Sequence, residues 1–195
     1  MQIVLSALLG LGLSASTGLN TFLPLLLLAA SARFGIAGIT LGEKFEWLTS
    51  DVAMIVLIIA VIIELIADKV PAIDHFLDTV GTFVRPIAGA VAAASVFTGI
   101  DPTVAALLGL IIGAPTSFGF HTLKAGTRVA SSAATFGCAN PIISLVEDIL
   151  SLALSVLSIF APLLVPVALV LLGVVLWQIV KRIRATGAAA AGSAP

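Results

Sequence analysis

A short polar pattern occurs twice in this chain, each time inside strongly apolar sequence. One copy lies at residues 12–32 and the other at 113–133, an offset of 101 residues, and the two agree at seven of 21 positions. The matched residues of the first copy are Gly12, Ser16, Gly18, Thr21, Ala29, Ser31 and Ala32. Matching polar interruptions in two apolar segments predict an internally duplicated membrane protein with broken helices, an arrangement typical of transporters and channels.

The composition places the whole chain in a lipid bilayer. Its 195 residues are 60% hydrophobic and only 10% charged, against about 25% charged residues in soluble domains. The net charge of −1 indicates no nucleic-acid partner. The charge-free stretch 2–32 would be about 46 Å long as one straight helix, too long for a single span unless it tilts or breaks. We therefore predict an all-α, polytopic membrane helical bundle.

The spacing of the apolar segments predicts six spans arranged as three plus three. A single membrane domain covers residues 1–186, with repeat one at 1–100, repeat two at 101–186 and a disordered tail at 187–195. The first and fourth helices are expected to be discontinuous. The expected spans are 1–32, 52–67, 83–99, 102–132, 141–160 and 163–180. Because each repeat crosses an odd number of times, the two repeats should be inverted relative to each other.

A second topology stays open. If each broken helix turns back as a re-entrant hairpin, only four full spans remain and the repeats become parallel. Positive charges favour a cytoplasmic C-terminus in both topologies, and a cytoplasmic N-terminus as well with six spans. The two residues on the opposite side in the six-span case are Arg33 and Lys44, against seven on the side of the termini: Lys69, Arg85, Lys124, Arg128, Lys181, Arg182 and Arg184.

The paired breaks are the predicted solute-binding or pore site. Unwound backbone at membrane depth is tolerated only when it is buried in protein or lines a wet cavity. Each break also leaves the N-terminus of a half-helix, which carries partial positive charge and suits an anion, a carboxylate or a polar solute. The alternative is that these small residues only allow close helix packing. The candidate residues are Ser16, Gly18, Asn20, Thr21, Ser117, Gly119, His121 and Thr122.

Charged side chains near the breaks are candidates for coupling and for attraction of a solute. Glu64 and Asp68 are expensive at membrane depth, and we assign them to proton or cation coupling. Lys124 and Arg128 share the helix face of His121 and would attract anions, unless they snorkel to the interface. Asp68, Lys69 and Arg85 instead suit a structural ion-pair network. Glu147 and Asp148 lie inside a predicted span and are functional or paired, with Arg128 as a candidate partner.

Three segments resemble a bacterial integral-membrane family catalogued as domain of unknown function four-one-two-six. The segments are 15–20, 64–74 and 85–90, and the pattern Glu-x3-Asp-Lys-x-Pro-x2-Asp in the second is the most specific. The resemblance covers nearly the whole chain. It implies a small multi-span protein of the bacterial inner membrane, and supplies neither a substrate nor catalytic residues.

The expected function is a membrane transporter or channel for a small polar or anionic solute, with Glu64 as a candidate for proton coupling. No nucleophile motif, nucleotide loop or metal-ligand set is present, so we expect no enzyme, no cofactor and no metal. Six spans in 195 residues leave little room for a gated cavity, which makes a homodimer plausible. The alternative is a non-transporting scaffold, assembly or lipid-interacting protein, in which Glu64 and His121 should be sealed by their neighbours.

Overall fold

The structure is a computed structural model that describes residues 2–135, 138–174 and 178. The chain divides into two compact units, residues 1–165 and 166–195. In the second unit, the described residues up to Val174 are helical. The predicted tail 187–195, the end of the predicted span 163–180 and the three basic residues at 181–184 lie outside the described residues.

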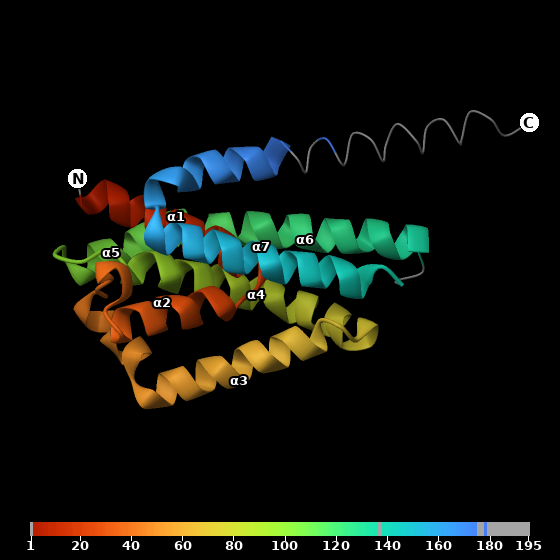
Figure 1. The fold of residues 1–195 in the computed structure, drawn as a ribbon, viewed down its shortest axis with the longest axis horizontal. Coiled ribbons are helices and arrows are strands. Elements are labelled where there is room, and N and C mark those ends of the chain that lie inside the picture. Colours follow the sequence, from red (N-terminus) through yellow and green to blue (C-terminus); the bar gives the residue numbers. More distant parts are fainter. Residues whose placement is uncertain (1, 136–137, 175–177, 179–195) are drawn as a thin grey trace, which may run out of the picture. The chain divides into compact units, whose positions relative to one another are not determined.

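The described residues of the first unit form helices joined by short loops, which confirms the predicted all-α class (Figure 1). The main elements are α1 (Gln2–Leu19), α2 (Leu23–Arg33), α3 (Asp51–Ala67), α4 (Pro71–Ser95), α5 (Pro102–Leu108), α6 (Ala114–Thr135) and α7 (Asn140–Phe160). Short helical turns complete the unit: η1 (Ile36–Gly38), η2 (Glu43–Thr49), η3 (Gly109–Gly113) and η4 (Pro162–Leu164).

The distribution of side chains is that of a membrane protein. Four of the described helices are long and apolar enough to span a bilayer, or five if η2 and α3, bent by 64°, form one span. On α3, large apolar side chains such as Ile55, Ile62 and Ile66 are exposed, whereas Arg85 and Lys124 are 1% and 2% exposed. A soluble protein has the reverse arrangement. An apolar outside around a charged inside fits lipid as the surrounding solvent.

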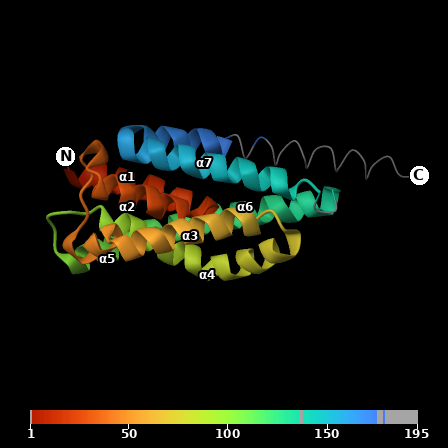
Figure 2. The same cartoon turned by 60° about the horizontal axis from the view of Figure 1, so that its bottom comes forward.

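Helix α1 lies at the centre of this unit and contacts α4, α6 and α7 (Figure 2). Small residues allow the close approach. A Cβ atom added to Gly10 would lie 3.1 Å from the Cα atom of Ala93 in α4, and one added to Gly12 would overlap Ser158 in α7. The apolar core lies in the half of the unit where α1 begins and includes Leu13, Leu28 and Leu57. The apolar packing is therefore concentrated in the half of the bundle where α1 begins.

The first predicted break is present, and it reverses the chain. Helix α1 ends at Leu19, and α2 runs back from Leu23 toward the end where α1 began (Figure 1). The side chain of Arg33, at the end of α2, reaches the backbone of Thr49 and the carboxylate of Asp51 at the start of α3. At 1.5 Å per residue α2 is about 16 Å long and does not cross a bilayer. The expected pair of half-helices that together cross at 1–32 is thus wrong, and the two helices form a hairpin instead.

The second predicted break is absent. The segment 102–132 is one continuous candidate span, in which η3 is a π-helical stretch between α5 and α6. The physical reason lies at one position of the repeat. The first copy has Pro24, which lacks an N–H group and disfavours continuation of the helix from the preceding turn, whereas the equivalent residue of the second copy is Ala125. The expectation of a discontinuous fourth helix was wrong.

The two copies of the pattern run side by side in the same direction. Thr17 Oγ1 donates a hydrogen bond to Ser117 Oγ over 3.0 Å, and Lys124 reaches back to the carbonyl of Leu19. Both helices point away from the end where α1 begins (Figure 1). Equivalent helices of an inverted repeat would run in opposite directions, so the described residues do not have the predicted three-plus-three inverted arrangement.

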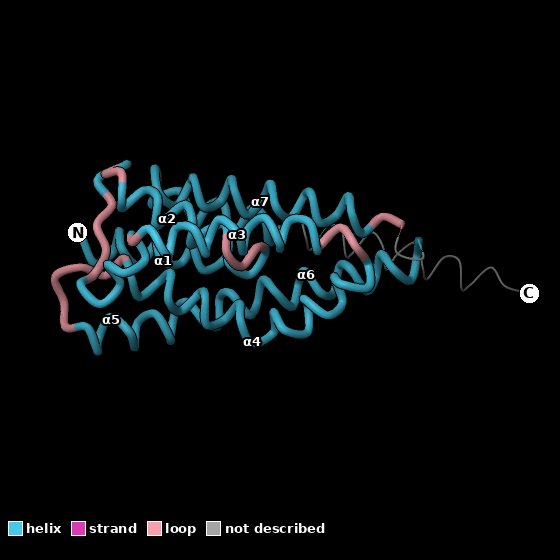
Figure 3. Tube along the Cα trace, turned by 90° about the horizontal axis from the view of Figure 1, so that it is seen from below, coloured by secondary structure: helices cyan, strands magenta, loops and turns pink. Residues whose placement is uncertain are grey.

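Most loops lie at the two ends of the bundle, and residues 20–22 form a short one between them (Figure 3). We call residues 20–22 the helix break. Thr17, just before it, lies beside Ser117, near the middle of the long helix that runs from Pro102 to Thr135. The break is therefore buried at mid-length of the bundle.

The predicted span at 83–99 is part of a longer helix, α4, which begins at Pro71 and has Pro86 inside it. Four of the basic residues that entered the charge count form ion pairs within the bundle: Lys69, Arg85, Lys124 and Arg128. The start of α1 also shares its end of the bundle with Arg33. The cytoplasmic placement of the termini therefore stays a prediction.

Candidate functional site

At the helix break, the carboxylate of Glu64 in α3 caps the N-terminus of α2. The backbone N–H of Thr21 lies 3.0 Å from both carboxylate oxygens of Glu64, and the Thr21 hydroxyl donates to Oε1 over 2.8 Å. The N–H of Phe22 donates to Oε2 over 3.2 Å. Asn20 Oδ1 accepts from the N–H of Leu23 over 3.0 Å. The free N–H groups that begin α2 are thus satisfied, and a negative charge lies at the positive end of the helix.

The backbone carbonyl groups at the C-terminus of α1 accept hydrogen bonds from side chains of other helices, two of which are positively charged. Lys124 Nζ donates to the carbonyl of Leu19 over 2.9 Å, and Arg85 Nη1 donates to the carbonyl of Gly18 over 3.0 Å. The hydroxyl of Ser151 donates to the carbonyl of Ser16 over 3.0 Å. Positive charges therefore lie at the negative end of α1. This self-contained pairing explains how unwound backbone persists away from water.

A larger set of charged groups extends from the break toward the end of the bundle that holds the turn between α3 and α4. We call it the charged cluster; its described members are Glu64, Asp68, Lys69, Asp78, Arg85, His121, Lys124, Arg128, Glu147 and Asp148. Lys124 Nζ lies 2.9 Å from Asp68 Oδ2 and 3.5 Å from Glu147 Oε2. Arg128 Nη2 lies 2.9 Å from Glu147 Oε2 and 3.3 Å from Asp68 Oδ2. The predicted pairing of Arg128 with Glu147 is confirmed, and snorkelling of Lys124 and Arg128 is wrong because both side chains are buried.

Asn20 connects the break to α7. Its Nδ2 donates to Asp148 Oδ1 over 3.0 Å, and the other oxygen of Asp148 accepts from Lys69 Nζ over 2.9 Å. Lys69 also donates to the hydroxyl of Ser144. With a side chain that is 35% exposed, Lys69 is the most open described member of this contact chain. The contacts therefore run from the centre of the break to the surface.

His121 bonds to α4 on the other side of α1. Arg85 Nη1 lies 3.2 Å from His121 Nδ1, and Thr82 Oγ1 lies 3.0 Å from Nε2. Because a guanidinium group only donates, Nδ1 must accept, which assigns the remaining ring proton to Nε2. His121 is therefore neutral here, and a second proton on Nδ1 would remove its contact with Arg85.

Gly18 and Ser117 form the closest packing at the break. A Cβ atom added to Gly18 would overlap the carbonyl oxygen of Ser117 and approach Phe120 to 2.5 Å. The hydroxyl of Ser117 donates to the carbonyl of Arg85 over 2.7 Å, which ties α6 to α4. Ser16 is fully buried and bonds to its own helix. For these three residues the contacts are those of tight packing.

Two predicted site residues point away from the cluster. Gly119 and Thr122 are exposed, and the Thr122 hydroxyl bonds only to its own helix, at the carbonyl of Gly119. On a continuous helix, residues 117, 121, 124 and 128 share one face by their spacing of four, three and four. Residues 119 and 122 lie off that face. Their counterparts are buried, Gly18 against Ser117 and Phe120 and Thr21 against Glu64.

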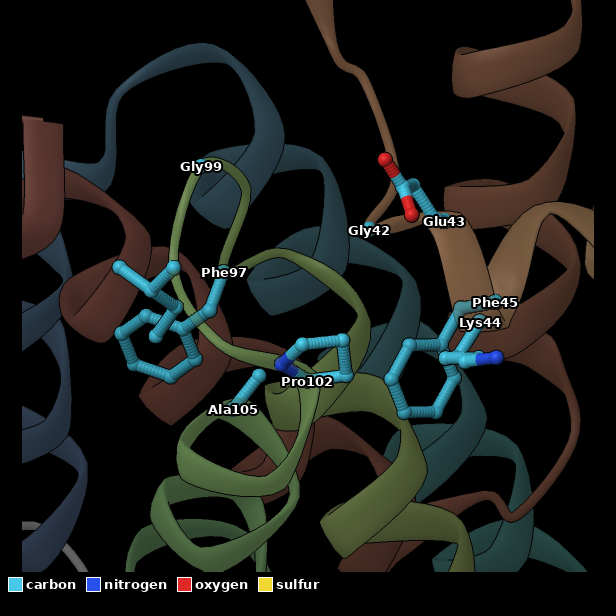
Figure 4. A pocket seen from close by; sticks show the side chains of 9 residues that line it. Gly42, Glu43, Lys44, Phe45, Phe97, Gly99, Pro102 and Ala105 are labelled. Carbon is cyan, nitrogen blue, oxygen red and sulfur yellow. The ribbon is translucent and has the colours of Figure 1, made fainter.

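Asn20 and His121, which occupy equivalent positions in the two copies, bond to different helices. Asn20 bonds toward α7, whereas His121 bonds toward α4, and the two are 0% and 3% exposed. Glu64 is 5% exposed. A cavity of about 290 Å³ lies instead at the end of the bundle away from the cluster, lined by residues such as Glu43, Phe97 and Pro102 (Figure 4). A second cavity of about 490 Å³, beside α7, has an apolar lining. Neither cavity includes a residue of the charged cluster.

Several residues that contact the break or its charged partners were outside the predicted site. Arg85, Glu147 and Asp148 contact the break or its charged partners, as do Lys69 and Ser151. One signal for the α7 residues is present in the sequence. Polar residues occur at 144, 148, 151, 155 and 158, a spacing of four, three, four and three inside an apolar helix. Such a stripe marks the face that α7 turns toward the other helices.

Removal of the Glu64 side chain should open the helix break locally. In Glu64→Ala the amides of Thr21 and Phe22 lose their acceptor, at about 1–3 kcal/mol for a buried donor. We expect hydrogen–deuterium exchange of these amides to become roughly 5- to 150-fold faster. Glu46→Ala, in an exposed position of η2, is the control and should leave their exchange unchanged. Equal exchange in the wild type and Glu64→Ala would contradict the capping role.

Comparison with known proteins gives a family but no activity. No curated protein and no solved structure matches the chain. The sequence model described as "Domain of unknown function (DUF4126)" matches residues 7–182, which include every described member of the charged cluster. The match covers most of the 195 residues. The chain therefore belongs to the DUF4126 family.

Proposed function

We propose that this membrane protein is a proton-coupled transporter of a small anionic solute, with the helix break as its solute site. The observation that carries the proposal is the position of Glu64. Its carboxylate occupies the N-terminal end of α2, where a solute anion would bind, and it uses the backbone N–H groups of Thr21 and Phe22. Glu64 is thus an internal substitute for the solute.

Protonation of Glu64 supplies the coupling step. A protonated carboxyl group accepts N–H groups poorly with its hydroxyl oxygen and loses its attraction to Arg85, 3.4 Å away. Glu64 then leaves the N-terminal end of α2, and a solute anion takes its place between Thr21, Phe22 and Arg85. Asp68, Lys124 and Arg128 hold the carbonyl side of the break in place during this exchange. In this proposal the protein is not an enzyme, because the bound solute is moved rather than converted.

The burial of the predicted site residues favours a second candidate function, that of a non-transporting scaffold. Glu64, Asn20 and His121 are sealed by their neighbours, as expected for a non-transporting scaffold in which the charged cluster only locks the helices together. The same burial is expected of a transporter whose solute path is closed. The two candidates differ in whether a proton movement accompanies an anion gradient.

The test is a flux measurement on full-length protein in vesicles that contain a pH-sensitive dye. We expect an inward gradient of at least one of chloride, nitrate, phosphate or succinate to change the internal pH faster than in protein-free vesicles. Glu64→Ala should abolish this change, and Glu46→Ala should retain it. If none of the four anions moves protons with the wild-type protein, the transport proposal fails and the scaffold is favoured.

A further inference from the structure

The buried carboxylates of the charged cluster differ in how many of their oxygens are bonded. Both oxygens of Glu64 accept hydrogen bonds at the helix break, and both oxygens of Asp148 accept, from Asn20 and from Lys69. Asp68 accepts only through Oδ2, from Lys124 and Arg128. Glu147 accepts a single hydrogen bond, from Arg128 to Oε2. Glu147 is therefore the least compensated of the four.

The two remaining oxygens are buried and unbonded. Oδ1 of Asp68 and Oε1 of Glu147 have no hydrogen-bond partner among the described residues. The two residues are 2% and 6% exposed, so bulk water does not solvate them. A charged oxygen in this position loses its hydration without replacement. A proton on one of the two oxygens removes a charge and supplies a donor.

Asp68 and Glu147 are also neighbours. Arg128 Nη2 lies 3.3 Å from Oδ2 of Asp68 and 2.9 Å from Oε2 of Glu147, and Lys124 Nζ lies between the same two oxygens at 2.9 and 3.5 Å. Two carboxylates held around shared cations repel each other when both are ionised. Such pairs favour the state in which one proton is bound.

The charged cluster has one more negative than positive group when every carboxylate is ionised. The groups facing the pair are Glu64 and Lys69 from the α3 side, Asp78 and Arg85 from α4, His121, Lys124 and Arg128 from α6, and Asp148 from α7. With Asp68 and Glu147 included, the described cluster holds five carboxylates and four Lys or Arg side chains, and His121 is neutral. One bound proton makes this set electrically neutral.

We propose that Glu147 is a proton-binding site, held protonated beside ionised Asp68 in the centre of the bundle. The site is separate from Glu64, which is fully bonded at the helix break. Its occupancy does not depend on whether the protein transports a solute.

Infrared spectroscopy of the full-length protein in lipid tests the proposal directly. A protonated carboxylic acid has a carbonyl-stretch band that an ionised carboxylate lacks. At neutral pH the wild-type protein should show this band. Carbon-13 in the side-chain carboxyl of glutamate should move it, whereas the same label in aspartate should not. Glu147→Gln should remove the band, and the matched neighbour Asp148→Asn should keep it.

Stability gives a second measure that does not rely on the band. Because Gln resembles the protonated side chain, Glu147→Gln should leave the unfolding temperature unchanged or raise it, whereas Asp148→Asn, which weakens an ionised pair with Lys69, should lower it. The proposal is overturned if the wild type has no band, if the band follows the aspartate label, or if Glu147→Gln lowers the unfolding temperature as much as Asp148→Asn. The spectra are read without any flux, so failure of transport would not affect them.

Discussion

Lys124→Met is expected to be among the most destabilising single substitutions in this protein, at about 3–5 kcal/mol of unfolding free energy. The ammonium group is buried and bonds to Asp68 and to the carbonyl of Leu19. Methionine fills a similar volume but leaves a buried carboxylate without its main partner and a carbonyl of the helix break without a donor. The measurement is denaturant unfolding of the detergent-solubilised protein.

Arg33→Met is the matched control for Lys124→Met. Arg33 also forms an ion pair, with Asp51, but these side chains are 34% and 80% exposed. Water screens such a pair, so the expected loss is only about 0.2–1 kcal/mol. A loss in Lys124→Met no larger than that in Arg33→Met would show that Lys124 does not hold the break together.

Gly113→Ala should be the second severe change, through steric overlap rather than charge. A Cβ atom at Gly113 would overlap the carbonyl oxygen of Gly89 and lie 2.7 Å from its carbonyl carbon, so α4 and η3 must separate. Overpacking of this kind costs about 1–3 kcal/mol. The same unfolding measurement reports it.

Gly119→Ala provides the comparison on the same long helix. A Cβ atom at Gly119 meets nothing within 4 Å, so only the helix propensity changes. Alanine should stabilise the exposed helix by about 0.5–1 kcal/mol. Opposite signs for the two substitutions are expected. Equal effects on the unfolding free energy would mean that α4 and η3 can separate without destabilising the protein.

The first helix break was predictable from the sequence because its residues act locally. Asn20 bonds to the N–H of Leu23 as an N-cap residue does, and Pro24 prevents the helix from continuing. The second copy has the same Gly–x–x–Thr pattern but has Ala125 in place of Pro24. The similarity of the two copies therefore led to the prediction of a second break, although the second copy has a different residue at the position of Pro24. The direction in which the chain turns also depends on Glu64 and Lys124, which are distant in sequence.

The charge count could not predict the buried ion pairs, for a related reason. It treats each Lys or Arg as a loop residue, whereas Arg85, Lys124 and Arg128 have carboxylate partners inside the bundle. A sequence pattern shows where along its own helix a charged residue lies. It does not show which residue of another helix forms the ion pair with it. The pairs Glu64 with Asp68 and Lys124 with Arg128 are each four residues apart, so each pair lies on one helix face. The sequence shows two complementary faces without showing that they meet.

The pairing at the helix break also sets an order for membrane insertion. When residues 1–33 leave the ribosome, the amides of Thr21 and Phe22 lack Glu64, and the carbonyl of Leu19 lacks Lys124, which is made 105 residues later. Each unsatisfied group costs several kcal/mol in hydrocarbon. The first hairpin therefore has to wait at the aqueous interface or in a protein-lined, hydrated environment until α3 and α6 arrive. We therefore expect final entry of the N-terminal segment to be a late step in the biogenesis of this protein.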